Sequence, residues 1–139
     1  MGSDALDETI RGFFRQDGWT IADGAGDPAA VRAIVETEAG RWSLGVWVTE
    51  DERIVVYSTI GDTVPTDRRA AVVALLGELN DGMILGNFEL DHEDGLVRFR
   101  TSIGVRETDV TEPLLRELVY PNIATVDEYL PSIVACISG

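Results

Sequence analysis

The sequence predicts an α+β domain in which an antiparallel sheet, made from a three-stranded meander and a second hairpin, packs with three helices. Three observations predict it. Apolar residues recur at helical spacing in three segments, alternating β-branched and aromatic residues fill two stretches between them, and short turn-forming segments interrupt both stretches. A chain of 139 residues with 45% hydrophobic composition suffices for one core. We therefore expect a single domain over residues 1–139 with the order α-β-β-β-α-β-β-α.

Helical periodicity marks the beginning of the chain. Leu6, Ile10 and Phe13 recur at helical spacing between Asp4 and Asp17, and Gly18 can cap the helix. Residues 19–22 have the character of a weak strand. The turn-rich segment 23–28 after them predicts a loop.

Three antiparallel strands are predicted between Val31 and Ile60, with tight turns at Ala39-Gly40 and Asp51-Glu52. Centring the hairpins on these turns sorts the side chains onto two faces. The predicted core face carries Val31, Ala33, Val35, Trp42, Leu44, Val46, Val48, Val55 and Tyr57. The opposite face carries Ile34, Trp47, Ile54 and Val56 beside Arg32.

That second apolar set is the one candidate site in the sequence. Apolar clusters are unusual on the surface of a highly charged protein and mark partner or dimer surfaces. We therefore predict a partner or dimer surface at Ile34, Trp47, Ile54 and Val56. The alternative is that a helix of the same chain covers them.

A second helix and a second hairpin follow. Thr66 is the predicted N-cap of a helix that ends at Asn80. Strands over residues 83–90 and 96–105 turn at 91–95. Centring on that turn pairs Glu89 with Arg98 on one face and, on the other, Phe88 with Phe99, Leu90 with Val97 and Ile84 with Ile103.

The last segment, 111–137, is predicted to be helical with Thr111 as its cap. Pro121 is expected to break or kink it. Thr125 and Glu128 have capping-box spacing for a second part, in which Pro131 predicts another bend.

Charge limits the partners of the chain. It has 25 acidic and 11 basic residues, all of the latter arginines, and a net charge of -14. Such a surface repels nucleic-acid phosphates and anionic lipids, so we expect no nucleic acid and no membrane as partner. Molar salt shortens the Debye length to about 3 Å and screens this self-repulsion. The composition thus fits a salt-accumulating cytoplasm, or else a GC-rich genome that replaces lysine by arginine.

Cys136 is the single cysteine, which excludes an intramolecular disulfide. Its apolar neighbours predict a buried thiol. A chain without a disulfide fits a reducing compartment. The sequence has neither a basic start followed by an apolar run nor a stretch of roughly 20 apolar residues. We therefore expect a cytoplasmic protein.

Two motifs have the outline of a functional site. His92 lies among carboxylates at the predicted hairpin tip, but consecutive residues point in different directions and a metal needs convergent ligands. Residues Gly24 to Ala29 match G-x-G-x-x-A, with acids Glu50 and Asp51 further on. That match needs a strand before it and a helix after it, whereas Val31 onward alternates as a strand.

No catalytic constellation emerges. The chain has one histidine, its serines lack a nucleophile-elbow context, and Cys136 lies on an apolar helical stripe. We predict no catalytic residue, no metal and no cofactor.

Several segments of the chain together form a familiar pattern: Leu79-Asn80, Leu85 to Asp91, Gly95 and Val97 to Ile103, with Val64-Pro65 and Val126 to Pro131. In these segments the chain resembles the YbjN family, whose name implies a sensory transduction regulator. It implies a fold similar to type III secretion chaperones, which are small, acidic, usually dimeric proteins that bind other polypeptides and catalyse nothing. The resemblance brings no catalytic residues with it.

Two functional hypotheses follow. The first is a non-enzymatic interaction module, chaperone-like or regulatory, that binds an unknown polypeptide and forms a homodimer. The second is a nucleotide-binding sensor or enzyme that uses the Gly24-Ala29 loop. Calorimetry with a panel of nucleotides separates them.

Overall fold

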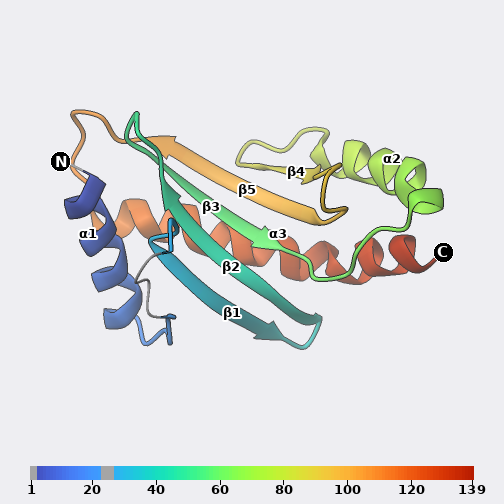
Figure 1. Ribbon diagram of the computed structural model, residues 1–139, viewed down its shortest axis with the longest axis horizontal. Helices are drawn as coiled ribbons and strands as arrows, with labels where there is room; N and C mark the ends of the chain where they lie inside the picture. The colour runs from blue at the N-terminus through green and yellow to red at the C-terminus, as the bar shows by residue number, and fades with distance from the viewer. Residues whose placement is uncertain (1–2, 23–26) are drawn as a thin grey trace.

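The computed structural model describes residues 3–22 and 27–139, whose strands form one antiparallel sheet (Figure 1). The helices are α1 (Ser3–Gln16), the 3-10 turn η1 (Thr66–Arg68), α2 (Arg69–Asn80) and α3 (Glu112–Ser138). The strands are β1 (Val31–Thr37), β2 (Gly40–Val48), β3 (Arg53–Thr59), β4 (Asn87–Leu90) and β5 (Val97–Gly104). The strand order is β1-β2-β3-β5-β4. The predicted α+β class and element order are confirmed.

The helices lie on one face of the sheet. Figure 1 shows α3 running behind the strands, with α1 near β1 and β2 at one end and α2 beside β4 at the other. The contacts agree: α3 packs on β3 and β5, α1 on β1 and β2, and α2 on β4 and α3. We call the helix-covered side the inner face and the opposite side the outer face.

Cross-strand rows of buried residues build the inner face. One row joins Val31, Val46, Val56 and Thr101 across four strands. The next joins Ala33, Leu44, Ser58, Phe99 and Phe88 across all five. All nine residues are buried, so the rows form the floor on which the helices pack.

A polar cluster lies inside this core. Asn122 of α3 accepts a hydrogen bond from Ser58 Oγ at 2.6 Å, and its amide group donates to Val56 O at 3.1 Å and to Thr101 Oγ1 at 3.2 Å. Ser58 in turn accepts from Trp42 Nε1 at 3.0 Å. Asn122 and Ser58 are both completely buried. Because buried polar groups are costly unless paired, this network fixes where α3 crosses the sheet.

The first helix ends as predicted, whereas the second does not begin as predicted. Gly18 has φ 86°, and Trp19 N donates to Phe14 O at 2.9 Å, which closes α1. Thr66 is not the N-cap of α2, because a 3-10 turn precedes that helix and its N-cap position is Arg68. The weak strand expected at residues 19–22 is not formed. One hydrogen bond, from Ala22 N to Arg32 O at 3.0 Å, links that segment to β1.

The last helix is continuous, so the break predicted at Pro121 is wrong. Two hydroxyl groups bond carbonyls in this part of the helix: Thr101 Oγ1 donates to Leu118 O at 2.7 Å, and Thr125 Oγ1 donates to Pro121 O at 2.8 Å. Thr125 therefore lies inside the helix and is not its capping residue. Thr111 does cap α3, since its hydroxyl accepts from Leu114 N at 3.4 Å.

The β4–β5 hairpin has the predicted register, with Phe88 opposite Phe99 and Glu89 opposite Arg98. The expected pair between Ile84 and Ile103 is wrong, because β4 begins only at Asn87 and Ile84 is fully exposed. Gly86 explains the late start. It has φ 80°, and a Cβ there would lie 2.5 Å from Arg100 O, so the chain reaches β5 only through a residue without a side chain.

The β2–β3 connection departs from the predicted register by one residue. The first hairpin sorts its side chains as predicted, although its loop is Glu38-Ala39. The second has a three-residue loop, closed by Thr49 N to Arg53 O at 2.9 Å, in which Glu52 adopts φ 59°. Such a loop carries one residue more than the predicted two-residue turn. Val46 therefore pairs with Val56 instead of Tyr57, and the inward and outward residues of β3 are exchanged.

Candidate partner-binding surface

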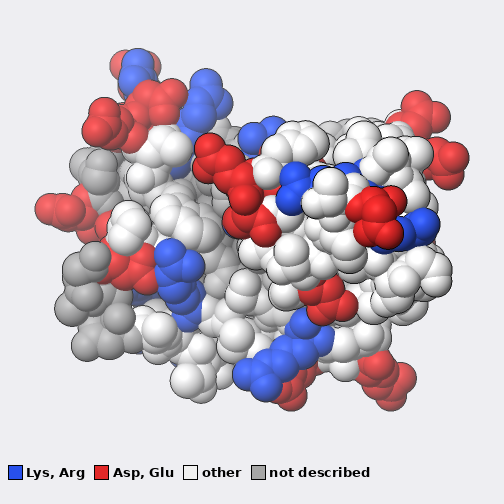
Figure 2. Space-filling view, turned by 45° about the vertical axis from the view of Figure 1, so that its right-hand side comes forward, with Lys and Arg blue, Asp and Glu red and all other residues white. Residues whose placement is uncertain are grey.

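The outer face of the sheet is not crossed by any helix in the part of the chain that the structure describes (Figure 1). Its cross-strand rows mix polar and apolar residues. One row reads Ile34, Ser43, Thr59, Arg98 and Glu89. Figure 2 shows, from another side, Asp, Glu and Arg side chains interspersed, with many acids near the outline. An apolar area on such a protein is therefore conspicuous.

The structure divides the four predicted surface residues. Ile34 is 50% exposed and Trp47 is half-buried, and both lie on the outer face. Ile54 and Val56 are each 0% exposed. Their assignment to a surface was wrong, because the extra residue in the β2–β3 loop turns them into the core. Val55, which pairs with Trp47, takes their place on the outer face.

Three neighbouring residues fix the position of the Trp47 side chain on this face. A Cβ on Gly45 would lie 2.3 Å from the indole ring, so the ring lies over the glycine. The Arg32 guanidinium is 5.2 Å from the ring centroid on one side. The Tyr57 ring contacts it edge-on at 5.7 Å on the other. These contacts fix the orientation of the indole ring and leave it partly exposed.

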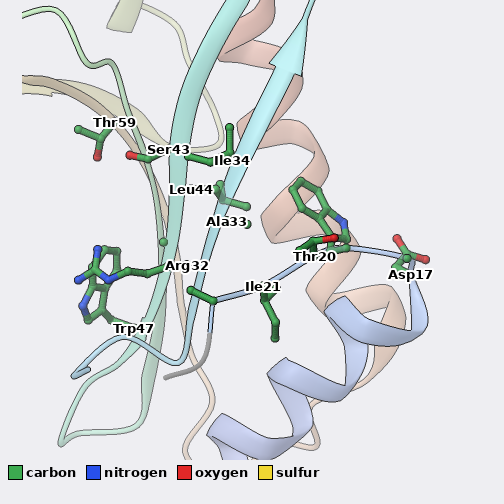
Figure 3. A pocket seen from close by; sticks show the side chains of 14 residues that line it. Asp17, Thr20, Ile21, Arg32, Ala33, Ile34, Ser43, Leu44, Trp47 and Thr59 are labelled. Atoms are coloured by element: carbon green, nitrogen blue, oxygen red, sulfur yellow. The ribbon is translucent and has the colours of Figure 1, made fainter. Parts of the chain in front are cut away.

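A groove with a volume of about 780 Å³ runs beside Trp47 and around the edge of β1. Figure 3 shows Arg32, Trp47, Ser43 and Thr59 on one side of β1 and Ile21 and Thr20 on the other. The small Ser43 lies opposite Ile34 and leaves room on β2, whereas the space over Gly45 is taken by the Trp47 ring. The groove is open along its length and mainly apolar, which suits a chain better than an enclosed small molecule.

Charges at the groove are paired within the chain. Arg32 Nε lies 2.5 Å from Asp27 Oδ2. Hydrogen bonds from Arg32 and from the Ala29 amide hold the pKa of Asp27 below its usual value. Burial and then the nearby Glu89 carboxylate raise the pKa of Tyr57, so its phenol is neutral at physiological pH.

A second cluster fixes the other wall of the groove. Asp17 accepts hydrogen bonds from Tyr120 and, at 2.5 Å, from Arg116 on α3. Trp19 Nε1 donates to the Tyr120 hydroxyl at 3.1 Å. The hydrogen bond from Tyr120, followed by that from Arg116, lowers the pKa of Asp17. This cluster anchors the chain between α1 and β1, and with it Ile21 in the groove wall.

Neither of the other two motifs forms a site in the described residues. Gly24, Ala25 and Gly26 lie outside them, but the chain enters β1 at Val31, so the helix that a dinucleotide fingerprint requires is not formed. At the hairpin tip, Asp91 Oδ1 accepts from Glu93 N and both Asp91 and Asp94 pair with Arg98, while His92 lies between them. Within residues 3–22 and 27–139, no three His, Cys, Asp or Glu side chains group as metal ligands would.

Cys136 differs from its predicted environment. Its thiol is only partly buried, and its carbonyl accepts a hydrogen bond from Arg68 Nε at 3.0 Å. The residue lies on α3, far along the chain from the groove, and lines none of it.

Reasoning from the sequence missed the residues that shape the surface. Ser43 and Thr59 line the hollow, Gly45 makes room for the Trp47 ring, and Tyr57 supports that ring. The available signal was Gly45 itself, because a glycine inside a strand marks a close approach of another group. No helix of the described residues is long and apolar enough to cross a membrane.

Comparisons with known proteins agree on the fold. The profile of the YbjN family, "Putative bacterial sensory transduction regulator", matches residues 6–134. No curated protein sequence gives a significant match. The structure titled "Crystal structure of YbjN, a putative transcription regulator from E. coli" is similar with a TM-score of 0.73 and 14% identity, over 92% of this chain and 90% of that one. The "ExsC-ExsE Complex" structure is similar with a TM-score of 0.52 and 12% identity, over 95% and 96%.

Proposed function

We propose, from the premise that this chain belongs to the YbjN family, that it is a non-enzymatic module which binds another polypeptide. The observation that carries the proposal is the outer face, where Ile34 is 50% exposed beside a tryptophan seated on Gly45. Rigid aromatic residues next to a hollow are typical anchors of protein interfaces.

Two further points support a polypeptide as the partner. The family is described as a regulator, and a structure that shares this fold was solved as the ExsC-ExsE complex. The net charge of -14 works against nucleic acid and anionic lipid surfaces. The homodimer, the cytoplasmic location and the salt-accumulating host remain predictions from the sequence.

A matched pair of substitutions tests the location of the surface. Ile34 and Val73 are exposed to similar extents, 50% and 46%, but Val73 lies on α2. Immobilised wild-type protein, Ile34→Glu and Val73→Glu are each exposed to extract of the native host at high salt. We expect a partner that wild type and Val73→Glu retain and Ile34→Glu releases.

Trp47→Glu is a second substitution that tests the same surface. It should leave the helical circular dichroism intact and abolish capture, or convert a dimer to a monomer if the partner is a second copy. Equal capture by all variants would move the site elsewhere. A chain that captures no saturable partner under any salt condition would contradict the proposed function.

A further inference from the structure

Among the described residues, few backbone groups bond to the edge of β1 that faces away from β2. Ala22 N donates to Arg32 O, so the Arg32 carbonyl points away from β2. Because successive residues of a strand turn their N–H and C=O groups to opposite sides, those of Ile34 and Glu36 face the same way. In the described part of the chain, Ala22 alone supplies a backbone hydrogen bond from outside the sheet to this edge.

The opposite edge of the sheet is closed by a side chain. Phe88 of β4 turns its peptide groups away from β5, where the side chain of Asn80 meets both. Phe88 N donates to Asn80 Oδ1 at 2.7 Å, and Asn80 Nδ2 donates to Phe88 O at 3.0 Å. Proteins protect sheet edges in such ways because an open edge pairs with other chains. Asn80 thus blocks the middle of the short β4 edge, whereas the described residues leave the Ile34 and Glu36 end of the seven-residue β1 edge without a backbone partner.

The groove follows the open edge. It contains Ile34 and Ser43 on the outer face and Trp19 and Ile21 on the other side of β1. Figure 3 shows Ile21 and Thr20 across the strand from Trp47. A strand lying along Ile34 to Glu36 would place alternate side chains on these two sides.

The charges at the Thr37 end of β1 favour basic residues in a partner. Glu36 is paired with Arg41 at 3.4 Å, and both side chains are about two-thirds exposed. Glu38, in the loop that follows, has no ion-pair partner among the described residues. With a net charge of -14 on the whole chain, a cationic segment is attracted to this end and an acidic one is repelled.

We propose that the partner adds an extended segment as a sixth, antiparallel strand to the edge of β1. The segment carries an apolar residue beside Ile34 and basic residues beside Glu36 and Glu38. Ala22 limits the added strand at the Arg32 end. The inference rests on the proposed polypeptide-binding function and adds its mode: the peptide N–H and C=O groups of Ile34 and Glu36 bind main chain, and the groove selects side chains.

The experiment uses a capped peptide, Lys-Val-Lys-Val-Val-Val, titrated into isotope-labelled full-length protein at low salt. In the antiparallel register its third residue lies opposite Glu36 and its fifth opposite Ile34. We expect saturable binding below about 1 mM and slower hydrogen exchange of the Ile34 and Glu36 amides. The peptide with glutamate in place of lysine should bind at least about tenfold more weakly.

Backbone methylation separates strand addition from side-chain docking. Only alternate N–H groups of an added strand face β1. N-methylation at the third and fifth peptide residues should abolish binding, while methylation at the fourth and sixth should leave it within about threefold. In the protein, Ile34→Pro removes one edge donor that no described residue uses, and proline is tolerated in edge strands. It should weaken binding at least about tenfold, and Ile34→Ala clearly less.

The failures are distinguishable. No saturable binding of the lysine peptide, or equal effects of both methylation patterns, would overturn strand addition. The proposed function would still stand if Ile34→Glu lost its native partner. A dimer that dissociates on Ile34→Pro would show that a second copy occupies the edge and would also overturn the inference.

Discussion

Asn122 provides a quantitative test of how α3 is positioned on the sheet. In Asn122→Leu the side chain keeps its approximate size but loses all its polar contacts, namely the bond from Ser58 and the bonds to Val56 O, Phe99 O and Thr101 Oγ1. The hydroxyl of Ser58, which is 0% exposed, then has no acceptor and cannot donate to water instead. The substitution therefore replaces a satisfied network by an unsatisfied donor.

The expected loss is about 3 kcal/mol. An intramolecular hydrogen bond contributes roughly 1 kcal/mol net, and an orphaned buried group costs about 1–3 kcal/mol. The two amide protons and one acceptor of Asn122 thus give about 3 kcal/mol, and the penalty at Ser58 approximately offsets the gain from burying leucine. At this chain length roughly 4 °C of Tm corresponds to 1 kcal/mol, which predicts a decrease of about 12 °C.

Urea unfolding at constant salt measures the change, with Ser58→Ala completing a double-mutant cycle. Removing both partners should cost less than the sum of the single losses, with a coupling energy of about 1 kcal/mol. A loss below about 0.5 kcal/mol for Asn122→Leu, or strictly additive losses, would refute the view that this network holds α3 in place.

Three further outcomes follow from other contacts. Asn80→Ala should destabilise the protein by about 1–2 kcal/mol and promote association through β4, because Phe88 loses both of its hydrogen bonds to Asn80. Light scattering measures the association, and its absence would contradict the protective role of Asn80. Because the pKa of Asp17 is lowered, its ionised carboxylate stabilises the fold at pH values above its ordinary pKa of 3.8, and this stabilisation is lost as the pH falls. Asp17→Asn should therefore make stability less dependent on pH in the acidic range, and an unchanged dependence would refute this role. If carboxylate repulsion is a main destabilising contribution, Tm should rise steeply between about 0.1 M and about 2 M KCl, and a flat response would remove the halophile prediction.

Some parts of the fold could be predicted because one register satisfied the side-chain pairs on both faces of the sheet. The β4–β5 register placed Phe88 against Phe99 on one face and Glu89 against Arg98 on the other, and the structure has both pairs. In β3 the signals did not separate the faces. Ile54, Val55, Val56 and Tyr57 are all apolar or aromatic, so the loop length alone decided their direction. That loop places Glu52 at a positive φ that favours glycine, and nothing in its sequence indicated the additional residue.

Tertiary contacts account for the other differences. Pro121 does not break α3, because the helix is held by its packing on β3 and β5 and neighbouring hydroxyls bond its carbonyls. At the candidate site, Ile34 and Trp47 were predicted from the alternation of the strand sequence alone. The open edge of β1 could not be predicted from the sequence. It depends on where the segment before β1 lies and on the hydrogen bonds by which Asn80 blocks β4, and both are properties of the folded chain.

Hydrogen–deuterium exchange of the chain with and without its captured partner tests most directly whether a polypeptide binds at the outer face of β1 and β2. Binding there should slow exchange in residues 31–37 and 43–47, with little change in α2. Protection confined to α2 and the exposed loop around Ile84, with β1 and β2 unchanged, would contradict it.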